Sequence, residues 1–360
     1  MEVFPDRKSE TEEKRSGLLP CDNAGNDSRP KSEGLLKNRL LHIAIAISLA
    51  TLLLYFSLRG IQWSQVWGII VHTDLRYLCL TVAIGTGASA VRALRWQVLL
   101  QHGGPVTFST AYFATVAGYF GNNYLPARAG EVIRVLMVSG KSGLSKMFVA
   151  TTALSERVSD GLALILISSF VLLTIPSRPG WFAHAARPFA VIGICGALCI
   201  AVMPRLEKFV HKIVFEFPGL PPALRARLEA VISHVLTALR AFHDVRRLVT
   251  FVAFTGVIWF SDAVGVVVLM HALHLQMNLA VAFLLITGLG LGSALPSTPG
   301  YLGIYQFVAV SVLVPFGFSK SDAIAYILLA QALQYFGTAV WGLIAFGWAR
   351  DMDLSSATRH

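Results

Sequence analysis

Long apolar stretches without a single Asp, Glu, Lys or Arg recur along this chain, for example Leu41–Leu58 and Pro188–Met203. A helix needs roughly 20 apolar residues to cross the hydrocarbon core of a bilayer, and somewhat fewer suffice where flanking side chains snorkel. The strands of a membrane β-barrel would instead alternate apolar and polar residues over about 10 positions. The stretches here do not alternate. The pattern therefore predicts an all-α polytopic membrane protein.

Charge is scarce and unevenly distributed. Only 14% of the residues are charged, about half of the roughly 25% found in soluble domains. The formal net charge is nevertheless +10, because Lys and Arg gather beside the apolar stretches, as expected for cytoplasmic loops and contacts with anionic lipid. No aromatic residues are interleaved with these clusters, so we expect no nucleic-acid partner. The cysteines lack metal-ligand spacing and His271 with His274 are too few for a site, so we expect no metal and no cofactor.

The order of the apolar segments predicts about six full membrane spans and two broken hairpins. The predicted full spans are about 40–58, 76–94, 147–173, 188–203, 248–273 and 322–349. The density of Lys and Arg in the loops places both termini in the cytoplasm. On this basis, residues 1–36 form a disordered polar tail, 37–350 the membrane domain and 351–360 a short C-terminal tail.

Two basic regions support this topology. Arg92 and Arg95 are interpreted as the cytoplasmic flank of the span 76–94. The loop 204–247 is rich in Lys and Arg, and Leu228, Val235 and other apolar residues recur in it at helical spacing. This spacing predicts an amphipathic cytoplasmic helix that lies at the membrane interface.

Two apolar segments are broken by proline and glycine. The segment that begins at Phe108 is interrupted near Pro126, and 279–295 is separated from 301–315 by Pro296-Ser297-Thr298-Pro299-Gly300. If the first segment crossed the membrane, the basic loop 204–247 would lie outside. The loop lies in the cytoplasm only if this segment turns back, which favours a re-entrant hairpin. Both breaks share the pattern L-P-x-x-x-G and are followed by G-x-S-K. Paired broken helices of opposite orientation are typical of inverted-repeat transporters, whose sites lie near the midplane; the alternative is a coincidence of short motifs.

The first break carries charges that could hold an anion. Gly130 relieves the turn, and Glu131 follows it in the first turn of the emerging helix, flanked by Arg128 and Arg134. The N-terminus of such a half-helix carries partial positive charge, which favours a group such as a lipid phosphate. The alternative is that Glu131 pairs with Arg128 or Arg134 and only holds the hairpin closed.

A second charged cluster lies inside the predicted span 147–173. Glu156, Arg157 and Asp160 are spaced so that they can share one helix face. Each charge costs at least ~2.5 kcal/mol at the centre of a membrane helix, so the cluster must face the interior of the bundle. We expect Arg157 and Asp160 to pair with each other or with the first hairpin, and we expect the partners of the cluster in that hairpin to be Arg128 or Arg134. The cluster is either a structural lock or part of a substrate or proton path.

Three motifs together resemble a known family. N-Y-L-P-A-R-A-G-E-V-I-R from Asn123, S-E-R-V-S-D-G from Ser155 and P-S-T-P-G-Y-L-G-I-Y-Q from Pro296 are similar to the flippase-like family of the lysylphosphatidylglycerol synthase transmembrane region, over roughly residues 40–349. The pattern departs from the family at Ala127, where a glycine is usual, and at Gln306, where a glutamate is usual. No soluble aminoacyl-transferase domain follows the last span, so we do not expect synthesis of lysyl-lipid.

The resemblance implies translocation of a lipid, or of a lipid-linked anionic substrate, across the cytoplasmic membrane, with lipid-biosynthesis enzymes as possible partners. The alternative is a membrane-embedded enzyme or accessory subunit of lipid modification or lipid-linked glycosylation. No catalytic residue is expected, because none of the usual membrane-enzyme motifs is present. The candidate substrate-binding or translocation residues are Asn122, Asn123, Pro126, Arg128, Gly130, Glu131, Arg134, Glu156, Arg157, Asp160, Pro296, Pro299, Gly300, Tyr301, Gly303, Gln306 and Gln331.

Overall fold

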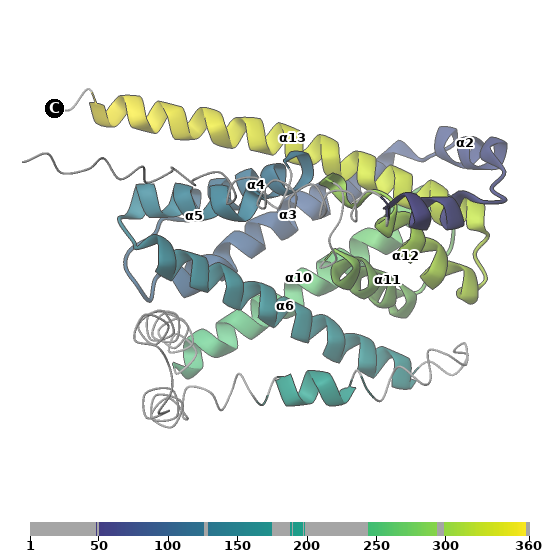
Figure 1. The fold of residues 1–360 in the computed structure, drawn as a ribbon, viewed down its shortest axis with the longest axis horizontal. Helices are drawn as coiled ribbons and strands as arrows, with labels where there is room; N and C mark the ends of the chain where they lie inside the picture. The colour runs from purple at the N-terminus through teal and green to yellow at the C-terminus, as the bar shows by residue number, and fades with distance from the viewer. Residues whose placement is uncertain are drawn as a thin grey trace, which may run out of the picture. The chain divides into compact units, whose positions relative to one another are not determined.

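The computed structural model describes residues 50–125, 129–174, 190–196, 244–293 and 299–357, together with Ser48, Pro188 and Leu198. Within these residues the chain consists of helices and their connections, with no strand (Figure 1). Residues 50–58 and 190–196 are helical. The labelled helices are α2 (Trp63–Val71), α3 (Leu75–Leu100), α4 (Phe108–Tyr124), α5 (Ala129–Ser142), α6 (Lys146–Thr174), α10 (Val245–Ala272), α11 (Leu279–Gly292), η3 (Pro299–Tyr301), α12 (Ile304–Leu313), η4 (Val314–Phe316) and α13 (Lys320–Ala357). The chain is therefore an all-helical protein, as the apolar stretches predict.

Four of these helices are long and apolar enough to cross a membrane: α3, α6, α10 and the part of α13 up to Arg350. They correspond to four of the six predicted full spans. Of the other two predicted spans, 40–58 and 188–203, the structure describes only parts, residues 50–58 with Ser48 and residues 190–196 with Pro188 and Leu198, and these parts are helical. The tail 1–36 lies wholly outside the described residues, and the loop 204–247 almost wholly.

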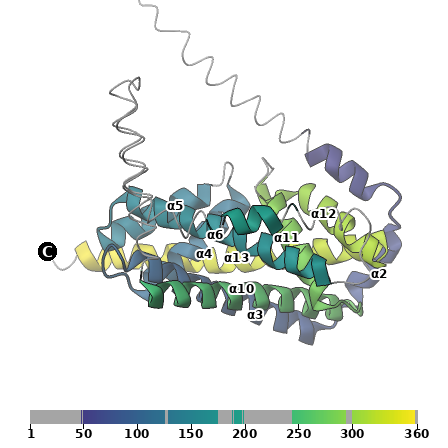
Figure 2. The ribbon, with the colours of Figure 1, turned by 90° about the horizontal axis from the view of Figure 1, so that it is seen from below.

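The helix α3 is longer than its predicted span, which ended at residue 94. It continues to Leu100 and packs along α10, as Figure 2 shows. Arg95 is consequently inside the bundle, with only 1% of its surface exposed. Arg95 was expected to flank the span but is a buried residue within α3, because the apolar residues that follow it extend the helix by another turn.

The helices α4 and α5 pack against each other as an antiparallel hairpin. Gly130 in α5 lies against Gly118 and Gly121 in α4, so closely that a Cβ atom on Gly130 would overlap the Gly118 carbonyl oxygen. Further along, Ala111 and Ala114 belong to the same buried cluster as Val138. Small residues at the crossing let the two backbones approach. The connecting residues 126–128, with the predicted break at Pro126, are outside the described part.

The second broken segment also has two short helices, α11 and α12, that contact each other. Between them Gly300, Tyr301 and Gly303 all have positive φ angles, of 73°, 61° and 85°. Gly303 ends this irregular stretch as the N-cap of α12. A left-handed conformation is strained for a residue with a side chain, so Tyr301 is held there by its surroundings. The predicted interruption of this segment is present, although Pro296 lies outside the described residues.

The helices pack around two main apolar cores. The larger consists mainly of residues of α6, α10, α11, α12 and α13, together with Val66 of α2. The smaller one packs α3, α4, α5 and α6 around the fully buried Trp96. The long helix α13 contacts α4 and α12 and runs along the upper edge of the bundle in Figure 1.

Candidate functional site

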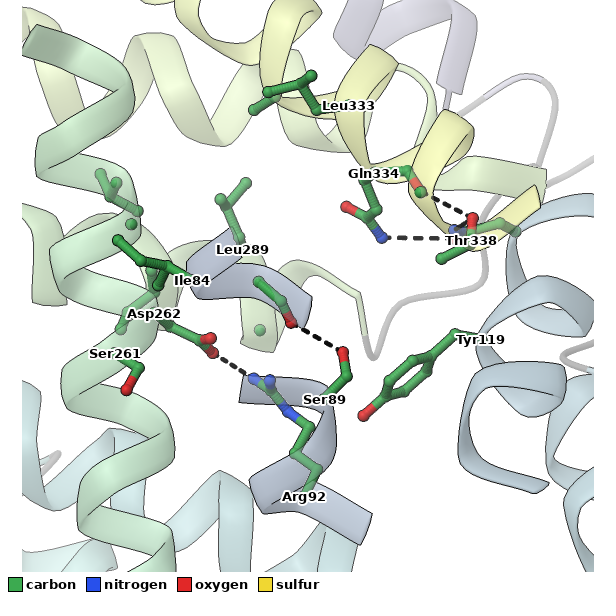
Figure 3. A pocket seen from close by; sticks show the side chains of 18 of the residues that line it. Ile84, Ser89, Arg92, Tyr119, Ser261, Asp262, Leu289, Leu333, Gln334 and Thr338 are labelled. Atoms are coloured by element: carbon green, nitrogen blue, oxygen red, sulfur yellow. Dashed lines mark hydrogen bonds and ion pairs between the residues drawn. The ribbon is translucent and has the colours of Figure 1, made fainter. Parts of the chain in front are cut away.

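A cavity of about 550 Å³ lies among the helices and takes wall residues from α3, α4, α5, α6, α10, α11, η3, α12 and α13. Part of its wall is apolar, with Ile84, Leu289 and Leu333, and part is polar, with Arg92 and Asp262 (Figure 3). Its size is in the range of pockets that hold a small organic ligand. A cavity with both kinds of wall fits a molecule that has a polar head and an apolar tail.

Arg95 of α3 is the centre of a buried ion network behind this cavity. Its Nη1 and Nη2 donate to the two oxygens of Asp160 at 2.5 and 2.9 Å, and Nη2 also donates to Glu156 at 2.8 Å. Arg134 of α5 donates to the other Glu156 oxygen. Arg95, Arg134 and Glu156 are each at most 2% exposed. Such paired geometry is needed here, because an unpaired buried charge is strongly destabilising.

Aromatic rings fix the positions of the two buried arginines. The Arg134 guanidinium lies 3.6 Å from the ring centroid of Trp96, and Arg95 lies 5.1 Å from that of Phe251. The Trp96 indole N–H in turn donates to Thr152 at 3.2 Å. Cation–π contacts add to the ion pairs when the charges are desolvated. The network therefore holds α3, α5 and α6 together in one fixed arrangement.

Two further ion pairs lie in the wall of the cavity itself. Arg157 of α6 donates through Nη2 and Nε to the same Glu131 oxygen, at 2.8 and 3.1 Å. The Arg157 and Glu131 side chains are 42% and 33% exposed, the largest exposure of any pair in the network. Arg92 of α3 pairs with Asp262 of α10, as Figure 3 shows. The Tyr119 hydroxyl also points into the space beside Arg92 in that view.

The charges of the described residues balance in this region. These residues include four arginines (Arg92, Arg95, Arg134 and Arg157) and four carboxylates (Glu131, Glu156, Asp160 and Asp262), and each has at least one partner of opposite charge. At ~2.5–3.5 kcal/mol for each charge at a helix centre, an unbalanced set would oppose membrane insertion. The pairing explains how the bundle retains eight charges in helices that are otherwise apolar.

The pairing differs in part from the sequence expectation. Glu156 does pair with Arg134, and Arg157 does pair with the first hairpin, through Glu131. Asp160, however, pairs with Arg95 and not with Arg157, because it faces α3 whereas Arg157 faces the cavity. Glu131 likewise does not pair with Arg134, whose guanidinium is turned away toward Trp96.

Sequence reasoning missed Arg92, Arg95 and Asp262. The two arginines were assigned to a membrane flank because they lie near the end of an apolar stretch, and Asp262 received no role. A signal was available: Asp262 is a lone carboxylate in an apolar stretch, and an apolar turn follows Arg95. An ionisable residue inside a span points to a functional or paired position.

A second polar cluster organises the irregular stretch before α12. Gln306 accepts from the Gly303 N–H at 2.8 Å and donates to the Gln331 side chain at 2.5 Å. Gln331 and the Tyr335 hydroxyl then both donate to the Gly300 carbonyl, at 3.0 and 2.7 Å. Backbone groups released by a helix break must be satisfied inside the bundle. The amide of Gln306 does this through neutral hydrogen bonds, without a carboxylate.

The first hairpin is attached to α13 next to the same place. Asn123 donates to Thr338 at 3.0 Å and accepts from Gln334 at 3.4 Å. Thr338 and Gln334 are labelled in Figure 3. The Tyr124 hydroxyl donates to the Tyr335 carbonyl at 2.9 Å. The helix α4 also contacts η3 directly. The two broken elements therefore meet, and α13 contacts both of them.

The predicted site residues fall into four groups. The cavity wall includes Asn122, Asn123, Glu131, Arg157, Asp160 and Tyr301. Buried side chains outside that wall are Arg134, Glu156, Gln306 and Gln331. Gly130, Pro299, Gly300 and Gly303 belong to the backbone of the two breaks. Pro126, Arg128 and Pro296 lie outside the described residues.

Several known proteins are similar to this chain. UPF0104 membrane protein MJ1078 of Methanocaldococcus jannaschii is 26% identical over 234 residues, which are 63% of this chain and 93% of that protein. A UPF0104 membrane protein of Methanothermobacter thermautotrophicus is 20% identical over 299 residues, 78% of this chain and 86% of that protein. Glycosyltransferase AglD of Haloferax volcanii is 24% identical over 341 residues, which are 84% of this chain. The match covers only 53% of AglD, so the chain spans about half the length of this relative.

The family match covers most of the chain. The sequence pattern described as the lysylphosphatidylglycerol synthase TM region matches residues 42–342, which include the cavity and both broken elements. The long apolar helices agree with a multi-pass membrane protein. This chain belongs to the lysylphosphatidylglycerol synthase TM region family.

Proposed function

We propose that the protein moves a lipid, or a lipid-linked anionic substrate, between the two leaflets of the cytoplasmic membrane. The observation that supports this function is the cavity, which combines charged and apolar wall residues inside a bundle of membrane helices. A polar head group cannot cross hydrocarbon without losing its hydrogen bonds with water. A polar cavity replaces those bonds along the path, while the acyl chains remain in an apolar environment.

The pair of Arg157 and Glu131 is the proposed contact for the anionic part of the substrate. Both side chains are in the cavity wall and at least a third exposed, so exchanging a partner costs less here than in the buried network. A phosphate can accept from the Arg157 guanidinium in place of Glu131, since guanidinium groups match phosphate geometry. The buried and ion-paired Arg95, Glu156 and Arg134 keep α3, α5 and α6 in place while Arg157 exchanges its partner.

The proposed membrane arrangement has six full spans and two re-entrant hairpins that form an inverted repeat, with both termini and the segment 204–247 in the cytoplasm. The lengths of α4 and α5 support the first hairpin. At about 1.5 Å per residue they reach about 25 and 21 Å, less than the roughly 30 Å of a hydrocarbon core. The contact between α4 and η3 supports a central site at which both hairpins end.

Lipid movement by the purified protein in liposomes tests the proposal. A phosphatidylglycerol labelled with a fluorophore is incorporated in both leaflets, and a membrane-impermeant reductant then destroys the fluorescence of the outer leaflet only. We expect the protein to expose the inner-leaflet lipid to the reductant. The double change Glu131→Leu with Arg157→Leu removes both partners and should slow this step by about 10-fold or more, since a hydrogen bond to a charged group contributes ~1.5–3 kcal/mol.

A matched control is the exposed pair of Arg247 and Asp244, which lies outside the cavity wall. Changing both of these residues to leucine should leave the rate of lipid movement unchanged. A Glu131→Leu and Arg157→Leu protein that moves lipid at the wild-type rate would end the assignment of this pair. Wild-type protein that moves no lipid would refute the function itself.

The similarity to glycosyltransferase AglD favours a second candidate function. In that case the protein would be a membrane subunit of lipid-linked glycosylation, and it would hold a lipid-linked substrate for a partner enzyme without moving it. The liposome experiment distinguishes the two functions. A subunit of this kind would bind lipid in the cavity without moving it between the leaflets, and a glycosylated product would form only when the partner enzyme is present.

A further inference from the structure

The cavity is too small to enclose a whole membrane lipid. A cavity of about 550 Å³ holds a molecule of drug size, so it can take the head group of a lipid but not two long acyl chains as well. The chains of a bound lipid must therefore leave the cavity through its wall. The wall must be open toward the bilayer at that point, because acyl chains are stable only in apolar surroundings.

Two helices of the wall leave space between them. The helices α3 and α13 each pack against α4, but no comparable packing joins α3 to α13 within the described residues. Both helices nevertheless line the cavity. In Figure 3, Ile84 and Ser89 of α3 and Leu333 and Gln334 of α13 border the same space. The cavity therefore separates α3 from α13.

The cavity wall reaches the protein surface on both helices. Val82 of α3 lines the cavity and is 45% exposed, and Gln334 of α13 lines it and is also exposed. Gly85 of α3 and Gly337 of α13 belong to the wall as well, and a Cβ atom at either position would meet nothing within 4 Å. The two glycines thus add no side chain to a space that neighbouring atoms leave free.

This space lies at the depth of the acyl chains. Gly85 is near the middle of α3, and Gly337 is near the middle of Lys320–Arg350, the apolar part of α13. Both helices are long and apolar enough to cross a membrane, so their middle turns lie in the hydrocarbon core and not among the head groups. An opening at this depth meets lipid and not water.

We infer that the cavity opens sideways into the bilayer between α3 and α13, and that the acyl chains of the bound lipid pass through this opening. The inference rests on the proposed function and specifies how the substrate is held. The head group lies in the cavity beside Arg157, and the chains extend past Gly85 and Gly337 into the membrane. The opening is thus a contact surface for long hydrocarbon chains, and it does not select the head group.

Tryptophan at the two glycines tests the opening. Gly85→Trp and Gly337→Trp each place a large apolar side chain in the free space, where no neighbouring atom excludes its Cβ. Each variant should slow the movement of dioleoyl-phosphatidylglycerol in liposomes by about 10-fold or more, because the chains must displace the indole ring before they can pass. A 10-fold change corresponds to an added barrier of ~1.4 kcal/mol.

Each variant has a matched control in its own helix. Gly87 of α3 and Gly347 of α13 also have nothing within 4 Å of a Cβ atom, but neither lines the cavity. Gly87→Trp and Gly347→Trp should therefore move lipid at the wild-type rate. Equal slowing by the controls would assign the effect to a tryptophan anywhere in these helices and would overturn the opening.

A short-chain lipid separates the opening from the head-group site. Native mass spectrometry of the detergent-solubilised full chain measures binding of dioleoyl- and dihexanoyl-phosphatidylglycerol, which share a head group and differ in chain length. The double change Gly85→Trp with Gly337→Trp should weaken binding of the dioleoyl lipid only, because the short chains need little space beyond the cavity. Equal loss of both lipids would mean that the indole rings occupy the head-group space, and it would overturn the inference.

The outcomes also separate this inference from the proposed function. If the wild-type protein and the double variant move dioleoyl-phosphatidylglycerol at the same rate, the opening is refuted and the function stands. Selective loss of dioleoyl binding in the double variant, without lipid movement by the wild-type protein, would refute the function and support the opening. Wild-type protein that binds neither lipid would refute both.

Discussion

At the scale of single residues, each buried charge among the described residues of the apolar bundle is stabilised by a hydrogen-bonded partner of opposite charge. Glu156 illustrates this, because each of its oxygens accepts from a different arginine, one on α3 and one on α5. Arg95 has a second carboxylate, Asp160, whereas the only ion pair of Arg134 within the described residues is with Glu156. The two arginines should therefore respond differently to the loss of Glu156.

We predict that Glu156→Leu destabilises the protein strongly, by about 3–5 kcal/mol, because it leaves Arg134 as an uncompensated buried charge. The double change Glu156→Leu with Arg134→Leu should recover most of this loss, since Arg95 keeps Asp160. Thermal unfolding of the detergent-solubilised protein measures both effects. Asp244→Leu, which breaks the exposed pair with Arg247, should cost less than ~1 kcal/mol. A double variant as unstable as the single one would contradict the assignment of Arg134.

At the scale of elements, the hairpin of α4 and α5 depends on the close approach of two backbones. Gly130 has no space for a side chain, because the Gly118 carbonyl oxygen and the Asn122 side chain occupy the position of its Cβ atom. This contact brings Glu131, the next residue, to the cavity wall beside Arg157. The glycine therefore connects helix packing with the proposed binding pair.

We predict that Gly130→Ala separates α4 from α5 and lowers both the thermal stability and the rate of lipid movement. The matched control is Gly140→Ala in the same helix, where a Cβ atom would meet nothing within 4 Å. Alanine is the better helix former by about 1 kcal/mol, so this change should be neutral or slightly stabilising. Equal stabilities of the two variants, measured by thermal unfolding, would show that the close contact does not hold the hairpin.

At the scale of the whole molecule, function depends on which face of the membrane each loop reaches. The proposed arrangement places the segment 204–247 in the cytoplasm, because Lys and Arg are enriched there. It places the loop between α6 and the following span outside. The cavity would then lie between two hairpins that enter from opposite faces.

We predict that a membrane-impermeant thiol reagent applied to intact cells labels Phe182→Cys but not Leu220→Cys, each in a background without other cysteines. Labelling of both positions after permeabilisation serves as the control for reactivity. The reverse pattern, with position 220 labelled from outside, would invert the arrangement of every later helix and refute both the topology and the inverted repeat.

The sequence by itself determined the class of fold and the main elements of this protein. Apolar stretches of membrane length require helices whatever their partners, so α3, α6, α10 and α13 could be predicted. The two interruptions could be predicted as well, since proline and glycine act on the local backbone. The charged cluster at Glu156 could be assigned to the bundle interior, because the cost of exposing it to lipid does not depend on the fold.

Only the tertiary structure decided which charges pair and which residues share a cavity. Arg95 and Asp160 are 65 positions apart and Arg92 and Asp262 are 170 apart, so no local pattern connects them. Helical spacing allowed Arg157 to pair with Asp160, but in the folded bundle Asp160 meets Arg95 of α3 and Arg157 meets Glu131 of α5. The sequence likewise could not show that the Trp259 indole N–H has no hydrogen-bond partner among the described residues, because this depends on the position of every neighbour.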